Sequence, residues 1–362
     1  DWMMTATYLH SDQEEALYKI IDGSPLNGDQ PLTPTLKAPD GRPIYNQTGR
    51  NTYKGGLYTE SGGERDVFSV AFSRYFNDGD GSFSMGYTHQ DIKELSGMAS
   101  TTANSSYGKY AASDYNNRTP QRSIYETEHR FFATASSTHY FLGADKPTTF
   151  NLYFERKSGL PGTYSWDTYT SSNYGGTAYQ QEAFGYEKNL NDDSSHLLYV
   201  PSGVSDPNVC WGSCAAPDLA IAAQVLDTLY NKLGLQGYAG QIVPNGVYEY
   251  PWRTSLDLKI TQILPGFRAE DEFVISLGIM NLLNLLDSDK GEAKYGPYNG
   301  KMAVLDMYMN EDFTKYIYPN YRGRGYPDYA YGFNSSNPKG IRKSAVNSIW
   351  RAQLGFTYKF SF

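Results

Sequence analysis

The last thirteen residues of the chain, from Trp350 to Phe362, alternate between apolar and polar side chains without a break. Successive side chains of a β-strand point to opposite faces, so this segment predicts a strand with one apolar and one polar face. Strands of soluble proteins are usually about 5–6 residues long. A tilted strand that crosses a bilayer needs about 9–11 residues. The segment therefore predicts a strand with lipid on one side and water on the other.

The same alternation recurs along the chain and gives ten candidate strands in total. The clearest further segments are Trp2–Tyr8, Phe68–Ser73, Ser82–Thr88, Phe150–Glu155, Ser255–Thr261 and Glu272–Ile279, and weaker ones lie at 129–142, 178–189 and 195–201. This repetition predicts an all-β protein, specifically a transmembrane antiparallel barrel wall.

The connections between these segments alternate strictly between short and long. The short ones are Asn77–Gly81, Gly143–Pro147, Asn189–Ser194 and Pro265–Asp271, and the long ones span about 11–65, 92–128, 158–177, 202–251 and 287–348. All long connections then leave the same end of the sheet. This arrangement is typical of outer-membrane barrels, whose long loops are extracellular and whose short turns are periplasmic. The C-terminus is accordingly expected on the periplasmic side.

Composition excludes several other classes of protein. The net charge is −8, so the chain lacks the basic footprint of a nucleic-acid-binding protein. Its longest apolar run, Val274–Leu286, is interrupted by polar residues and falls short of the roughly 18 residues of a membrane helix. The chain contains no G-x-S-x-G, P-loop, H-E-x-x-H or C-x-x-C motif, so we expect neither an enzyme nor a cofactor.

One segment has helical instead of strand periodicity. In Pro217–Gly234, apolar residues recur at spacings of three and four, Pro and Asp precede them, and Gly234 follows. We expect an amphipathic helix within a long loop. Its polar face lacks a basic cluster, which favours packing on the loops over binding to a membrane surface.

Short motifs in the second half of the chain resemble, in their order, those of TonB-dependent outer-membrane receptors, and more specifically the Oar-like branch. They are HLLYVPSG (196–203), DPN (206–208), PNG (244–246) and NLLNLLD (281–287), the last of which contains Asn281, Leu282, Leu283 and Asn284. The resemblance implies a 22-stranded barrel with a plugged lumen. Residues 1–362 would be its C-terminal portion, contributing the last ten strands, and the plug domain and N-terminal barrel strands would precede them. It also implies that the terminal aromatic residues Tyr358, Phe360 and Phe362 serve as a barrel-assembly signal.

The same resemblance implies a function and partners. The receptor would capture a ligand with its extracellular loops and pass it through the barrel, with energy from the TonB complex acting on the plug. The ligand would be a peptide, a glycan or a metal chelate. The lumen would be lined by Glu155, Asp257, Lys259, Arg351, Gln353 and Lys359. Alternatives are a barrel scaffold that presents loops for adhesion or for assembly with a surface or periplasmic protein and, less favoured, a membrane-embedded hydrolase.

The last long loop is rich in tyrosine and arginine, which are common anchors of recognition surfaces. Its candidate ligand-binding residues are Tyr295, Tyr298, Tyr318, Tyr321, Arg322, Arg324, Tyr326 and Tyr329. The competing interpretation is that these side chains pack loops against one another, because a loop of this length needs a small core of its own.

Cysteine and histidine are the remaining candidates. Cys210 and Cys214 are predicted to form a disulfide in an oxidising compartment, since two cysteines without nearby histidines do not complete a tetrahedral zinc site. His89 and His129 are expected at the outer rim, where a solvated pair is favoured over a metal pair. His196 is expected near the short-turn end, and no metal site is predicted.

Overall fold

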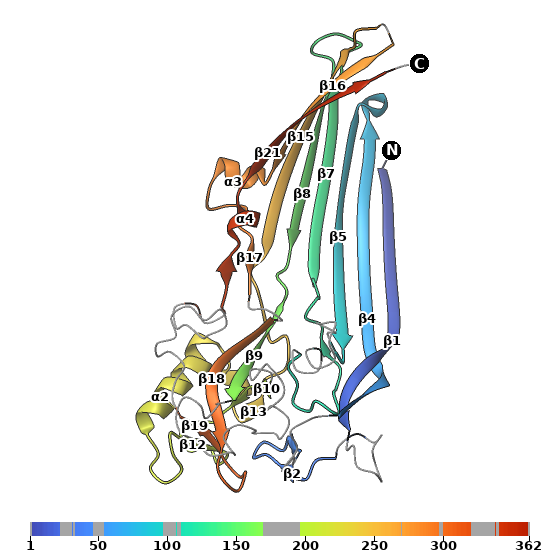
Figure 1. Cartoon of the computed structure of the whole chain (residues 1–362). Helices are drawn as coiled ribbons and strands as arrows, with labels where there is room; N and C mark the ends of the chain where they lie inside the picture. Colours follow the sequence, from blue (N-terminus) through green and yellow to red (C-terminus); the bar gives the residue numbers. More distant parts are fainter. Residues whose placement is uncertain are drawn as a thin grey trace.

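The structure is a computed structural model that describes residues 2–21, 31, 33–45, 54–96, 106, 110–168, 196–268, 270–296, 300–319, 337 and 340–360. Long strands lie side by side in a single-layered sheet, and a compact domain built from the long connections lies at one end of it (Figure 1). We call this compact part the loop domain; it comprises the described residues of 33–45, 110–126, 158–168, 196–250 and 300–319.

The sheet is antiparallel throughout, with the strand order β1-β4-β5-β7-β8-β15-β16-β21 and the short β6 beside β5. These strands are β1 (Trp2–Ile21), β4 (Lys54–Phe76), β5 (Gly81–Glu94), β6 (Gln121–Arg122), β7 (His129–His139), β8 (Thr148–Lys157), β15 (Arg253–Pro265), β16 (Glu272–Met280) and β21 (Arg351–Lys359). The all-β prediction is confirmed. In the described residues the sheet is open, because β1 and β21 are its outer strands and each pairs with one neighbour.

Three of the four predicted short connections are confirmed, and the fourth, Asn189–Ser194, lies outside the described residues. The first long connection is shorter than the predicted 11–65, because β1 continues to Ile21 and β4 begins at Lys54. Three tight turns join β4 to β5, β7 to β8 and β15 to β16, and they lie together at the end of the sheet opposite the loop domain (Figure 1). The first turn contains η1 (Asn77–Gly79), in which Asp78 and Gly79 have positive φ angles of 52° and 104°. Asp and Gly tolerate this left-handed region, which is why the NDGDG sequence reverses the chain there.

The predicted number of strands is wrong. β8 pairs directly with β15 along 148–157, so the sheet has no place for strands from 178–201 between them. Residues 178–189 and the turn Asn189–Ser194 lie outside the described part. Residues 196–200 form the short strands β10 (His196–Leu197) and β11 (Tyr199–Val200) in the loop domain, where all five are buried. The pattern at 195–201 thus reflects burial on every side, not one apolar face.

Register aligns the apolar positions of neighbouring strands on one face. One row across the sheet joins Met4, Phe72, Met85, Ala133, Phe154 and Leu256. The opposite face carries rows such as Asn151, Lys259, Gly278 and Gln353. Glu155, Asp257, Lys259, Arg351, Gln353 and Lys359 share this polar face, as the sequence predicts. Strict period-2 alternation keeps the two faces distinct across the whole sheet.

Aromatic side chains mark both ends of the apolar face. Near the loop domain they are Tyr8, Phe68, Tyr87, Phe131 and Trp252, and near the tight turns they are Trp2, Phe150, Phe267, Phe273 and Tyr358. Aliphatic residues such as Leu152, Leu258, Leu277 and Leu354 occupy the band between them. The face therefore has aromatic side chains concentrated at its two borders, with a mainly aliphatic band between them that also includes Phe72 and Phe154.

The loop domain has its own hydrophobic core. Its main sheet runs β10-β9-β18-β19-β12, with β14 beside β9. Its strands are β9 (Pro161–Thr168), β12 (Val209–Trp211), β14 (Tyr248–Glu249), β18 (Lys301–Met309) and β19 (Tyr316–Tyr318), and the smaller pairs are β2 (Leu36–Lys37) with β3 (Pro43–Ile44) and β11 with β13 (Gln241–Ile242). Its largest fully buried side chains are Trp166, Tyr110, Tyr115, Tyr164, Tyr316 and Tyr318. The long connections thus fold on one another.

The predicted helix is confirmed as α2 (Leu219–Asp227), continued by η5 (Thr228–Lys232) and followed by η6 (Gln236–Tyr238). The Asp218 side chain accepts a hydrogen bond from the Ala220 N–H and caps its first turn. Ala222, Val225 and Leu229 are fully buried against the loop-domain core, whereas Leu219 is 66% exposed. No helix in the described residues is both long and apolar enough to cross a bilayer.

Candidate functional site between the sheet and the loop domain

Arg122 is the centre of an ion-pair network at the junction of the sheet and the loop domain. It lies in β6, which pairs with the end of β5. Its guanidinium donates hydrogen bonds to Glu126 (2.5 Å), Glu128 (2.7 Å) and Glu249 (2.8 Å). Glu128 immediately precedes β7 and Glu249 ends β14, so one side chain joins three segments.

The charges of this network depend on one another. Burial alone would lower the pKa of the Arg122 guanidinium, but the carboxylates of Glu249 and Glu126 raise it. Burial opposes ionisation of Glu249, but the hydrogen bonds with Arg122 and Glu128 and the charges of Arg122 and His129 together outweigh it and lower the pKa of that carboxyl. Burial and the neighbouring Glu249 raise the pKa of Glu128. The pKa values of the two glutamates therefore shift in opposite directions, although the charge of Arg122 favours the ionised form of both.

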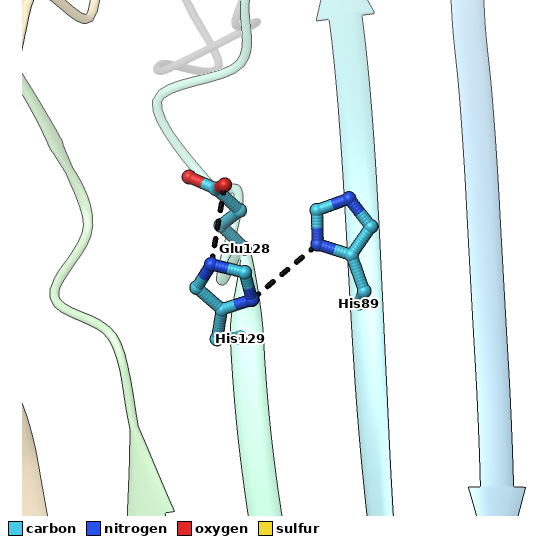
Figure 2. A group of neighbouring side chains, drawn as sticks. All are labelled: His89, Glu128 and His129. Carbon is cyan, nitrogen blue, oxygen red and sulfur yellow. Dashed lines mark hydrogen bonds and ion pairs between the residues drawn. The ribbon is translucent and has the colours of Figure 1, made fainter.

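Two histidines lie directly beside this network. His89 of β5 and His129 of β7 are cross-strand partners, and their Nδ1 atoms are 3.4 Å apart (Figure 2). Glu128 Oε1 lies 3.3 Å from His129 Nε2. The Tyr87 hydroxyl is 2.8 Å from His129 Nδ1, and the Trp252 ring stacks on the same imidazole with a centroid distance of 5.9 Å. The pair lies at the loop-domain end of β5 and β7, which is the end of the sheet where the sequence predicts it.

Arg122 also lines a groove of about 510 Å³. Its polar lining residues are Asp91, Lys93, Ser113, Thr119, Gln121, Arg122 and Asn245. Lys93 forms an ion pair with Glu64 at 3.0 Å. A carboxylate, an ammonium group and amides in one groove can bind a ligand that has both donors and acceptors, such as a peptide or a glycan.

Only two of the predicted tyrosine and arginine ligand-binding residues can be placed. Tyr318 is fully buried, and its hydroxyl donates to the Tyr199 carbonyl at 3.0 Å, so at this position the structure favours the packing interpretation over ligand binding. Tyr295, in β17 (Lys294–Tyr295), is 49% exposed and stays a candidate. Tyr298, Tyr321, Arg322, Arg324, Tyr326 and Tyr329 lie outside the described residues.

The predicted disulfide is confirmed, with the Cα atoms of Cys210 and Cys214 4.9 Å apart. It closes the short segment between β12 and α2. The predicted location of His196 is wrong, since this residue is buried in the loop domain with its ring 5.5 Å from that of Tyr115.

Residues of the terminal strand hold the last tight turn. The Tyr358 hydroxyl donates to Asp271 (2.7 Å) and accepts from the Phe267 N–H (2.7 Å). The Phe360 ring lies 4.8 Å from that of Tyr358. Phe362 lies outside the described residues. Their role in barrel assembly stays a prediction.

The NLLN motif shapes the end of β16. Asn281 has a φ of 57° and precedes the short helix α3 (Leu282–Leu286). Its side-chain amide donates to the carbonyls of Gly291 and Ser348, each at 2.9 Å. Asn284 similarly donates to the carbonyls of Ser288 (2.9 Å) and Lys290 (3.1 Å). The motif therefore secures the exit of the chain from the sheet; β20 (Arg342–Lys343) and α4 (Ala345–Ser348) complete its return.

We expect Asn281→Ala to destabilise this junction by about 1–3 kcal/mol, because it leaves two carbonyl groups without their donor. Asn281→Gly is the matched control, since glycine accepts the positive φ but makes neither hydrogen bond. Denaturant titration of both variants separates the two effects. If Asn281→Gly is as stable as the unmodified protein, the two side-chain hydrogen bonds contribute nothing and the positive φ angle alone explains the asparagine.

Sequence reasoning missed Glu128, Arg122 and Trp252. Glu128 directly precedes His129, so the proximity of these two residues could be predicted from the sequence. The sequence places His89 and His129 at the same rim, because one ends its strand and the other begins the next, but it does not predict their direct contact. Only the register of β5 against β7 brings the two histidines into contact.

Searches of protein-family models, curated proteins and solved structures return no match to this chain.

Proposed function

We propose that the protein is an outer-membrane receptor of the TonB-dependent class, in which the sheet forms part of a barrel wall and the loop domain captures the ligand. The carrying observation is the uncovered apolar face. Leu354 and Phe356 are 58% and 61% exposed, and the hydrophobic core of the described residues lies in the loop domain. A soluble protein would bury such a face against a second layer. Contact with the fatty-acyl chains of a bilayer would instead keep this uncovered face in an apolar medium.

The two aromatic borders support the same proposal. In membrane barrels, aromatic girdles flank the apolar band where it meets the lipid headgroups. The Tyr87, Phe131 and Trp252 cluster lies at one border, and Phe267, Phe273 and Tyr358 lie at the other. Their separation by aliphatic residues matches a slab of lipid more closely than the centre of a soluble sandwich.

The polar face and the groove supply a route for a ligand. A hollow of about 470 Å³ on the polar face is lined in part by Ser82, Thr134, Asn151, Asp257 and Lys259. The groove beside Arg122 lies where the loop domain meets the sheet. A peptide or glycan that leaves this groove along the polar face of the sheet would meet the polar side chains of that face.

Transport can be tested in cells that carry the receptor, using a library of fluorescent oligopeptides and oligosaccharides. We expect accumulation of at least one probe to need both TonB and an intact groove, so Lys93→Met should reduce it. Accumulation that is independent of TonB would refute the transport proposal.

A second function, a scaffold for surface assembly, is favoured by the self-contained core of the loop domain. Tyr316 and Tyr318 stabilise the loops from inside and leave the outer surface free to bind a partner protein. A partner that copurifies from membranes, with uptake unaffected by replacement of the groove residues, would support this alternative.

A further inference from the structure

We infer that His89 and His129 form a binding site for a divalent transition metal ion, with Glu128 as the residue that orients His129. Figure 2 shows the three side chains together, with His89 and His129 on neighbouring strands. By register, the two histidines lie at the border of the apolar face next to the loop domain. The inference is independent of the proposed transport function, because it rests only on the geometry of these side chains.

The spacing of the two histidines suits a shared metal ion. With metal–nitrogen bonds of about 2.0–2.1 Å and tetrahedral angles, two ligand nitrogens lie about 3.4 Å apart. The Nδ1 atoms of His89 and His129 are 3.4 Å apart. Two neutral imidazoles whose lone pairs both point into this space repel each other, whereas a cation between them is stabilised by both.

Glu128 controls which nitrogen of His129 is available. Its Oε1 lies 3.3 Å from Nε2, so the carboxylate can accept the Nε2–H and leave the lone pair on Nδ1, the atom that faces His89. The other carboxylate oxygen accepts from Arg122 at 2.7 Å, which fixes the carboxylate itself. The Tyr87 hydroxyl, 2.8 Å from His129 Nδ1, is the nearest further oxygen donor.

The surroundings also define the class of metal. Two imidazoles with a phenol oxygen suit ions of borderline hardness such as Zn²⁺ and Cu²⁺, and not Ca²⁺ or Mg²⁺, which take oxygen ligands. Trp252 stacks on His129, and Phe131 lies against both Trp252 and Tyr87. A bound ion would join β5 to β7 at the point where Glu128 and Arg122 connect these strands to the loop domain. Ion binding would therefore stabilise this junction.

The test is calorimetric titration of Zn²⁺ into the EDTA-treated protein in detergent. We expect one ion per chain, affinity at least tenfold lower in His89→Ala and in His129→Ala, and about tenfold lower in Glu128→Gln. His10→Ala is the matched control: His10 lies at the same border beside Glu64 and Asp66, but it has no second histidine, and its loss should leave the affinity unchanged.

A spectroscopic measurement on the unmodified protein distinguishes loss of the metal site from misfolding of a variant. Cu²⁺ quenches nearby indoles, so titration of the unmodified protein should quench the emission that Trp252→Phe removes. Electron paramagnetic resonance should show two nitrogen ligands. Absence of stoichiometric Zn²⁺ binding, undiminished affinity in the His89→Ala/His129→Ala double variant, or loss of binding in His10→Ala would each overturn the inference.

Discussion

Replacing Leu152 by arginine should destabilise the protein in lipid vesicles by about 2–4 kcal/mol, the cost of a cationic side chain near the bilayer midplane on a barrel surface. Leu152 lies in the middle of β8, between Ala135 and Leu258 on the apolar face. It is 40% exposed, so in water the same substitution would change stability by less than about 0.5 kcal/mol. The measurement is the denaturant midpoint of the protein refolded into phosphatidylcholine vesicles.

Asn151→Arg is the matched control for this prediction. Asn151 is the preceding residue, and its side chain is on the polar face opposite Lys259. We expect a change below about 1 kcal/mol, because that face is in contact with water. Equal effects of the two substitutions would mean that the faces do not differ in solvent, and the membrane proposal would fail.

Replacing Arg122 by methionine should destabilise the loop domain by about 3–5 kcal/mol, because it leaves the buried Glu126 carboxylate and two neighbouring glutamates without their cation. Near-ultraviolet circular dichroism of the buried tyrosine and tryptophan side chains, followed during thermal unfolding, reports on this domain. Arg130→Met is the control, since its ion pair with Glu155 is 45% exposed on the arginine side and should contribute less than about 1 kcal/mol.

The destabilisation should also depend on pH. The pKa of Glu249 is lower in the folded protein than in the unfolded chain. Its contribution to stability is therefore complete above the unfolded value and is lost as the pH falls through the folded one. Because Arg122→Met removes that contribution, the difference between the variant and the unmodified protein should narrow in acid. A difference that widens in acid would contradict the assigned role of Arg122.

The alternation of apolar and polar residues predicted most strands of the sheet correctly, but it failed at residues 195–201. Segments such as 255–261 and 350–360 have one apolar and one polar face, and a single-layered sheet requires that pattern. Residues 195–201 contain the same types of side chain but are buried on both faces in the loop domain. Periodicity reports local exposure and carries no information on which sheet a strand joins, so the predicted strand count was too high.

The candidate site was less predictable than the fold. The disulfide was predictable because Cys210 and Cys214 are close in sequence, and the helix because its spacing is local. Tyr318 resembled a recognition residue in composition, yet the packing of β19 places it in a core. Composition does not distinguish a tyrosine that binds a ligand from one that packs, because both use the same ring and hydroxyl.

The sequence by itself determined the strand-based architecture, the two unlike faces and the end from which the long connections leave, since all three depend on neighbours along the chain. The tertiary structure alone decided that these connections share one core, and that Arg122 meets Glu249 and His89 meets His129. Such contacts join residues 127 and 40 positions apart. Their formation depends on strand register and loop packing, which local side-chain patterns do not specify.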